Sequence, residues 1–100
     1  MLRIQREDVN DHEVTLVLQG RIGEEWADLL ESECGALKRS GLRVALDFSG
    51  VVFIGRSGFE ALSRLSHAGV EIVDCSPLLA AMLEQEGIVA KRASSDAEYR

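Results

Sequence analysis

The sequence predicts an α/β fold in which helices pack against a mixed sheet of four to five strands. Short aliphatic runs alternate with amphipathic stretches of helical period, in the order β-β-α-β-α-β-α with a short final strand added at the end. The run at residues 43–48 is typical of a strand buried on both faces of a parallel sheet. Strands separated by single helices imply largely parallel pairing. With 100 residues, the chain can form one domain with one core.

The N-terminal part predicts a β-hairpin. Residues 2–6 and 14–18 alternate between apolar and polar side chains, and residues 8–11 between them form a turn-rich Asp-Val-Asn-Asp cluster. The second strand would point one face inward, made of Val14, Leu16 and Leu18.

A helix is expected after the loop at residues 20–23. It opens with Glu24 and Glu25 and closes with Lys38 and Arg39 before Gly41, so the charges suit the helix dipole at both ends. Spacings of three and four residues define its inward stripe: Trp26, Leu30, Cys34 and Leu37.

The centre of the chain combines a strand at 43–48, a second apolar run, a glycine-flanked turn at 55–58 and another helix. Ser57 and Glu60 have the spacing of a capping box, which predicts that this helix begins at Ser57 and ends near His67. Such a turn exposes backbone N–H groups at the positive end of a helix dipole. We therefore expect function to be located here.

The last third predicts a strand at 70–75 and a helix that starts at Ser76-Pro77 and ends at Gly87. Residues 88–90 would add a short strand. We expect a single domain over residues 1–92 and a polar tail, the stub of a final helix, over 93–100. The inward face of the helix after Pro77 would be Leu78, Leu79, Met82 and Leu83.

Composition excludes several classes of function. The net charge of −6 disfavours binding to nucleic acid. The chain has neither the apolar run that membrane insertion requires nor the apolar core of a signal peptide, so a cytoplasmic location is expected. Cys34 and Cys75 lack redox or metal spacing and are interpreted as buried thiols. His12 and His67 lack metal-ligand partners, and neither a metal nor another cofactor is expected.

No enzyme signature is present in the sequence. A nucleophile elbow, a Cys/His pair, a Walker loop and a dinucleotide-binding glycine pattern are all missing. Asp47 ends a strand and so resembles the phospho-acceptor of response regulators, but the acidic pair that follows the first strand of that fold is replaced here by Gln19-Gly20-Arg21. We therefore expect no catalytic residues.

Residues 46–58, Leu-Asp-Phe-Ser-Gly-Val-Val-Phe-Ile-Gly-Arg-Ser-Gly, resemble the STAS domain of sulfate transporters and anti-sigma factor antagonists. That family has a strand ending in Leu-Asp-Leu-Ser, an apolar run, and Asp-Ser-Ser-Gly-Leu opening a helix. The element order also matches, and the resemblance covers about residues 10–90. It implies a non-catalytic protein-interaction module, which a partner kinase often switches by phosphorylating the first serine of the motif.

This sequence departs from the family at the switch itself. The motif's aspartate falls on Gly55, its phospho-acceptor serine falls on Arg56, and an acid that often follows the second strand falls on Gly23. Arginine cannot accept a phosphoryl group, so the usual switch is excluded by residue type. Ser57 is open to two interpretations, a structural helix cap or a weak candidate for a displaced phosphorylation site.

We place the partner-binding surface at the turn and the neighbouring second strand, with Arg56 either solvated or in contact with an acidic partner. An arginine at a helix N-terminus opposes the dipole, which an acidic partner or a bound anion would relieve. The predicted surface comprises Gly55, Arg56, Ser57, Gly58, Phe59 and Arg21.

Three functional hypotheses stand open. The partner is a kinase-like anti-sigma factor, or the chain is a cytoplasmic accessory subunit of a membrane transporter such as a lipid ABC transporter. In a different class, the domain senses a nucleotide or small anion at Arg56. The helix at 57–67 is shorter than usual for the family and a last helix is missing, so a partly uncovered sheet face suggests a homodimer as a further hypothesis.

Overall fold

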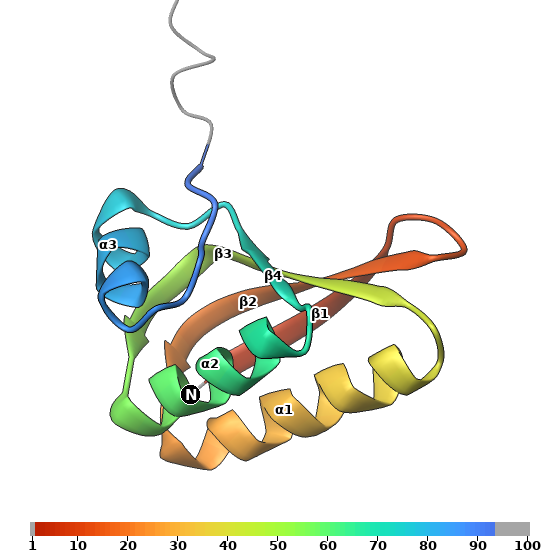
Figure 1. Cartoon of the computed structure of the whole chain (residues 1–100), viewed down its shortest axis with the longest axis horizontal. Coiled ribbons are helices and arrows are strands. Elements are labelled where there is room, and N and C mark those ends of the chain that lie inside the picture. Colours follow the sequence, from red (N-terminus) through yellow and green to blue (C-terminus); the bar gives the residue numbers. More distant parts are fainter. Residues whose placement is uncertain (1, 94–100) are drawn as a thin grey trace, which may run out of the picture.

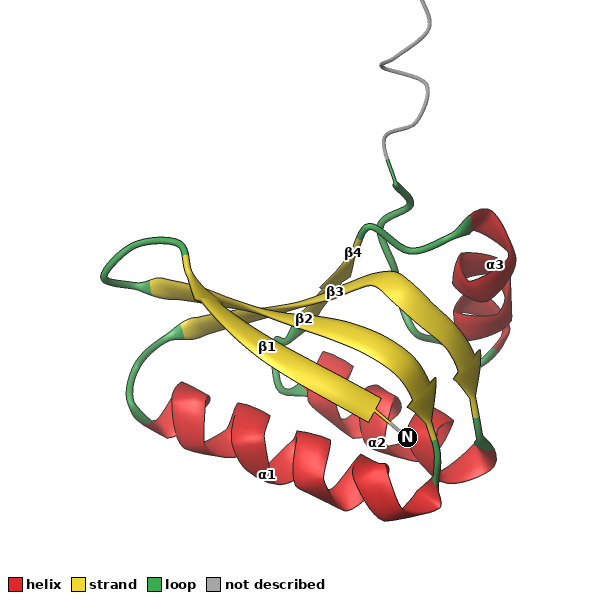
Figure 2. Ribbon diagram, turned by 180° about the vertical axis from the view of Figure 1, so that it is seen from behind, coloured by secondary structure: helices red, strands yellow, loops and turns green. Residues whose placement is uncertain are grey.

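A computed structural model describes residues 2–93 of the chain. It contains a four-stranded mixed sheet in the order β1-β2-β3-β4, with β1 antiparallel to β2 and the other neighbours parallel. Helices α1 and α2 lie side by side on one face of the sheet, and α3 lies beside the far end of β3 (Figures 1 and 2). The elements are β1 Leu2–Asp8, β2 Glu13–Ile22, α1 Glu24–Arg39, β3 Arg43–Ile54, α2 Arg56–His67, β4 Glu71–Val73 and α3 Pro77–Gln85.

The predicted hairpin is confirmed and is longer than expected. β1 pairs with β2 from Leu2 opposite Gly20 to Asp8 opposite Val14. The connecting turn is closed by the N–H group of Val9, which donates to the carbonyl of Glu13 at 3.0 Å. The inward residues of β2 are buried as predicted, namely Val14, Leu16 and Leu18.

Strand β3 is longer than the sequence predicted, because the run expected to end at residue 48 continues to Ile54. The parallel register between β2 and β3 shifts twice along this extension, and both strands bend there (Figure 2). Gly50 makes the close approach possible, since a Cβ atom there would lie 2.7 Å from Cγ of Gln19 and 3.0 Å from the carbonyl oxygen of Leu18. Only glycine fits this crossing without displacement.

Helix α1 confirms most of its predicted inward stripe. Leu30, Cys34 and Leu37 are buried, together with Ala27. Trp26 is only half-buried and packs against the edge of the core. Both cysteines are buried and unpaired, and burial raises the pKa of the Cys34 thiol to about 12. Cys34 therefore remains a protonated packing residue at neutral pH.

The capping box predicted at Ser57 and Glu60 is wrong. Helix α2 begins one residue earlier, at Arg56, with Gly55 as the N-cap and no side-chain cap hydrogen bond. The carbonyl of Gly55 already accepts the N–H group of Phe59 at 3.0 Å, so Ser57 lies inside the first turn. The hydroxyl of Ser57 is therefore not occupied in capping, and replacing it with alanine removes no cap.

The start of α3 is confirmed, but its predicted inward face is partly wrong. The hydroxyl of Ser76 accepts the N–H group of Leu79 at 3.3 Å, and Pro77 occupies the first turn. Leu78 and Met82, expected inside, are 71% and 37% exposed. The helix is apolar on nearly every side, so periodicity could not select the buried face. The residues that are buried are Leu79, Ala80 and Leu83.

The short strand predicted at residues 88–90 is not formed. The side chains of Ile88 and Ala90 are buried, but the backbone pairs with the β4 edge only from residue 91 onward. The N–H group of Lys91 donates to the carbonyl of Ile72 at 2.9 Å, and Cys75 forms an isolated parallel bridge with Arg92. Strand β4 itself is shorter than the predicted 70–75. Most of the predicted tail, residues 94–100, lies outside the described residues.

Gly58→Ala should lower the free energy of unfolding by about 1–2 kcal/mol, because overpacking is costly in a filled interior. An added Cβ would lie 2.9 Å from the carbonyl oxygen of Ile22 and 3.0 Å from methyl groups of Ile22 and Ile54. Urea denaturation measures the change.

Gly35→Ala in α1 is the matched control. Its Cβ would meet only the flexible end of Arg39 at 3.3 Å. Alanine is favoured over glycine inside a helix, so this variant should be more stable by about 0.5–1 kcal/mol. Equal effects of the two substitutions would contradict the packing assigned to Gly58.

Candidate functional site

The loops that follow β2 and β3 meet at the carboxyl ends of these two parallel strands. The N–H group of Gly55 donates to the carbonyl of Ile22 at 2.9 Å. A Cβ built on Gly55 would lie 3.9 Å from Cα of Gly23. The carboxyl ends of neighbouring parallel strands are where α/β proteins commonly bind their ligands. The fold thus brings Arg21, on β2, close to residues 55–59.

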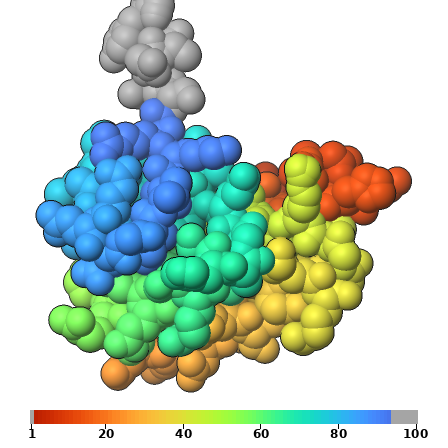
Figure 3. Space-filling view, in the orientation of Figure 1, coloured from red at the N-terminus to blue at the C-terminus, as the bar shows by residue number. Residues whose placement is uncertain are grey.

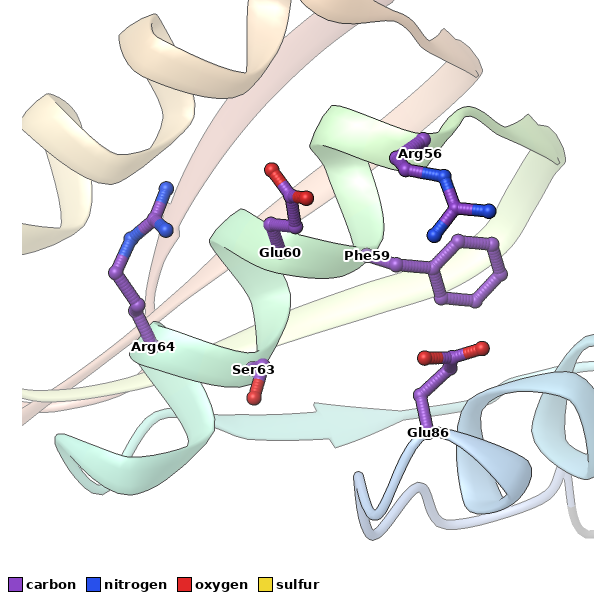
Figure 4. Close-up of a pocket in the computed structure, with 6 residues that line it drawn as sticks. All are labelled: Arg56, Phe59, Glu60, Ser63, Arg64 and Glu86. Carbon is purple, nitrogen blue, oxygen red and sulfur yellow. The ribbon is translucent and has the colours of Figure 1, made fainter.

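Arg56 is the first residue of α2, and its side chain is exposed. It takes part in none of the ion pairs formed among residues 2–93. The first turn of α2 contains no acidic residue, so the positive charge opposes the helix dipole without local compensation. In Figure 4 the guanidinium group lies beside the ring of Phe59. Phe59 is half-buried and packs against the core, which holds this ring in place.

A hollow of about 470 Å³ lies between α2 and the end of α3. In Figure 3 the green start of α2 borders the blue end of α3 in this region. Glu86 reaches toward the ring of Phe59 from the α3 side (Figure 4). Arginine, aromatic and carboxylate groups therefore face one another across the hollow. Its lining residues are Arg56, Phe59, Glu60, Ser63, Arg64 and Glu86.

A second hollow of about 600 Å³ lies between the start of α1 and the end of β3. Phe53 lines it and is 52% exposed, and the adjacent Val52 is 71% exposed. The indole N–H group of Trp26, on the other side, is buried and has no hydrogen-bond acceptor among the described residues. The hollow is lined by Arg21, Gly23, Glu24, Glu25, Trp26 and Phe53.

The structure places every predicted site residue at this end of the domain, but in unequal environments. Arg56 and Arg21 are exposed, Gly55, Ser57 and Phe59 are half-buried, and Gly58 is buried. Gly58 therefore shapes the turn and presents no side chain to a partner.

Sequence reasoning missed Phe53 and Glu86 as surface residues of this site. Phe53 belongs to an apolar run that predicts burial, yet the strand bends before it and leaves the ring partly in solvent. Glu86 comes from the end of α3, more than twenty-five residues further along the chain, and no local pattern connects the two. It is brought here by the position of α3 beside the far end of β3 (Figure 1).

An ion pair between α1 and α2 helps to hold the orientation of α2. The guanidinium group of Arg64 donates two hydrogen bonds to the carboxylate of Glu31, each 2.8 Å long. The hydrogen bonds from Arg64 lower the pKa of Glu31 below its ordinary value. Arg64 is therefore occupied in structure, which leaves Arg56 as the cation of the first hollow that has no carboxylate partner among the described residues.

Within residues 2–93, no cluster of three or more histidine, cysteine or acidic side chains has metal-binding geometry. In the same range, no helix has the length and apolar character needed to cross a membrane.

Comparison with protein-family models finds no match, and a search of curated proteins finds no relative. Solved structures, in contrast, match along nearly the whole chain. An anti-sigma factor antagonist from Mycobacterium paratuberculosis is 19% identical with a TM-score of 0.73, over 97% of this chain and 90% of that one. The unphosphorylated anti-sigma factor antagonist SpoIIAA is 17% identical with a TM-score of 0.68, over 96% and 93%.

The phosphorylated form of SpoIIAA, described as a Bacillus cell fate determinant, is also similar. It is 17% identical with a TM-score of 0.67, over 95% of this chain and 96% of that one. The fold is therefore that of the STAS and SpoIIAA-like anti-sigma factor antagonists, as the resemblance at residues 46–58 implied.

Glu31→Gln should lower the free energy of unfolding at pH 7 by up to about 1 kcal/mol, because it removes the carboxylate that Arg64 binds. The pKa of Glu31 is depressed in the folded protein, so this contribution is full above the ordinary glutamate pKa of about 4.3 and is lost as the pH falls through the folded value. Urea denaturation at pH 7 and near pH 3 should show the difference from wild type shrinking in acid. Glu33→Gln, an exposed change on the same helix, should have little effect at either pH. A difference that persists in acid would contradict this role.

Proposed function

We propose that this protein is a non-catalytic, cytoplasmic interaction module that binds a protein partner through the end of the domain where β2 and β3 terminate. The observation that carries the proposal is the surface formed there by Arg21, Arg56, Phe53 and Phe59 on an anti-sigma factor antagonist fold. The preferred partner is a kinase-like anti-sigma factor that presents acidic side chains.

The composition of this surface supports a protein partner. Arginine and aromatic residues are enriched at binding hot spots, where a few side chains contribute most of the affinity. Both arginines lack carboxylate partners among the described residues, so an acidic partner group can bind them without first breaking an ion pair. Phe53 offers an exposed ring beside Arg21, and Phe59 offers a ring anchored in the core beside Arg56.

The proposed module binds without a phosphorylation switch at the usual position. Arg56 is the first residue of α2, where the family motif has its phosphorylatable serine. A phosphoryl group there would add about −1.5 to −2 charges, whereas Arg56 keeps a fixed charge of the opposite sign. Ser57 is half-buried inside the first turn and remains a weaker candidate acceptor. Partner binding is therefore constitutive in this proposal.

A second candidate is a nucleotide or small-anion sensor, favoured by the unprotected start of α2. This helix has no side-chain cap, and the guanidinium group of Arg56 lies at its positive end. Backbone N–H groups and a cation at a helix N-terminus can hold a phosphate. A third candidate, a transporter accessory subunit, would use the same surface on a different protein.

Arg56→Glu should weaken binding to the kinase-like partner by at least about tenfold, because it places a like charge against an acidic surface. Phe59→Ala should weaken binding as well, through loss of the anchored ring. Isothermal titration calorimetry with the purified partner measures both. Arg39→Glu is the matched control. It makes the same charge change at the C-terminal end of α1, away from Gly23 and the proposed surface.

An unchanged affinity of Arg56→Glu for the partner would contradict the proposed surface. Titration of the wild-type protein with ATP and GTP separates the second candidate: heat that disappears in Arg56→Glu would favour anion sensing over protein binding. If only a transporter subunit binds, and the same substitution weakens that complex, the third candidate holds.

Incubation with the partner kinase and ATP should leave the mass of the wild-type protein unchanged. Arg56→Ser, which supplies a hydroxyl at the family's usual position, should gain one phosphoryl group under the same conditions. Intact-mass spectrometry gives the result. A phosphorylated wild-type protein, with the group on Ser57, would overturn the constitutive mode.

A further inference from the structure

The outer edge of β1 is unpaired in the described structure. β1 is the first strand of the sheet and hydrogen-bonds only to β2. Figures 1 and 2 show no described segment along its other side. The opposite edge, along β4, is different because the backbone of residues 91–93 pairs with it. An open edge strand exposes N–H and C=O groups that can pair with another strand.

An apolar groove runs beside this open edge, between β1 and α1, with a volume of about 270 Å³. Leu29 on α1 is 41% exposed there, and Ile4 on β1 is half-buried. Arg6 and Glu33 supply opposite charges to the same groove. The edge therefore combines free backbone hydrogen-bonding groups with an apolar surface and with side chains of both charge signs. The lining residues are Ile4, Arg6, Leu16, Leu29, Glu33 and Leu37.

We propose that β1 pairs antiparallel with β1 of a second copy of this chain, about a two-fold axis through Gln5, to form a continuous eight-stranded sheet. The charge pattern of β1, Leu-Arg-Ile-Gln-Arg-Glu-Asp, favours this pairing. In this register Gln5 faces Gln5, and Arg3 of each copy faces Glu7 of the other. Opposite charges placed directly across an antiparallel pair are stabilising.

The register is selected by the same charges. A two-fold axis perpendicular to the sheet requires facing residues to lie on the same face of the strand. Moving the axis to Arg6 would place Arg6 against Arg6, a like-charge pair. Moving it to Ile4 would leave Glu7 and Asp8 without facing residues within β1. The axis through Gln5 pairs all seven residues of β1 and opposes no like charges.

The groove adds a second complementarity in this register. Arg6 of one copy faces Ile4 of the other, and Ile4 lines the same groove as Glu33. The guanidinium group of Arg6 binds the carboxylate of Asp8 in its own strand at 2.8 Å, so the contribution of Arg6 across the seam is its apolar stem, which can cover Ile4 of the second copy. Arg3 and Glu7 are exposed and form no ion pair within residues 2–93, so both are available to a second copy.

The expected association is weak. Seven residues at about 3.4 Å each form a seam of about 24 Å. Such an interface falls at the small end of specific protein contacts. We therefore expect a monomer–dimer equilibrium at micromolar to millimolar concentration, independent of the partner surface at Arg56.

Sedimentation velocity from about 10 µM to about 1 mM tests the proposal. The wild-type protein should shift toward twice its monomer mass. Arg3→Glu and Glu7→Arg should each weaken dimerisation by at least about tenfold, because each creates two like-charge pairs across the seam. The double variant should regain the wild-type dissociation constant, since the facing pairs again have opposite signs.

The controls separate this mechanism from its alternatives. The two single variants change the net charge in opposite directions, so a shared loss cannot come from net charge. Lys91→Glu, at the opposite edge of the sheet, and Arg56→Glu should both dimerise like the wild type. Circular dichroism verifies folding of each variant. A wild-type protein that stays monomeric at the highest concentration, or a double variant that fails to recover, would overturn the β1 seam without bearing on the proposed partner surface.

Discussion

The close approach between the end of β2 and the start of α2 constrains the geometry of the candidate site. The carbonyl of Ile22 accepts a hydrogen bond from the backbone of Gly55 at 2.9 Å, and Gly58 is pressed against the same residue. A side chain at position 58 would push the helix away. Because it has none, two loops separated by more than thirty residues in sequence form one surface, with Arg21 and Arg56 on it.

That constraint acts through the backbone and the buried side chains of the turn, so it leaves the exposed residues of the turn free to differ from those of the STAS motif. The glycines and buried aliphatic side chains build the STAS-like turn, and the polar groups of the family's switch are replaced by Gly55 and Arg56. A fixed cation beside an anchored ring suits recognition of an acidic partner, whereas a switch requires a group whose charge changes. The absence of a side-chain cap on α2 leaves its positive end open to the acidic partner that we propose.

The predictions that succeeded concerned elements for which all the local sequence signals favoured the same structure. The alternation of β2, the charged ends of α1 and the Ser76-Pro77 helix start are satisfied by contacts within a few residues. The predictions that failed concerned places where more than one residue or segment could take the same structural role. Helix α2 begins at Arg56 with Gly55 as its N-cap, so Ser57 does not cap it. Helix α3 is too uniformly apolar for its sequence to indicate the buried face, and the backbone pairs with the β4 edge at residues 91–93 instead of forming a strand at 88–90.

By itself, the sequence determined the fold class and the order of the elements from β1 to α3, because periodicity, glycines and caps act locally. The tertiary structure decided which side chains share the turn at residues 55–58. Glu86 reaches it from α3 and Phe53 is exposed beside it because β3 bends, and neither follows from local pattern. The open edge of β1 is likewise a property of strand order in the assembled sheet. Contacts between segments that are distant in the sequence depend on how the helices pack against the sheet, and this packing depends on side chains throughout the chain.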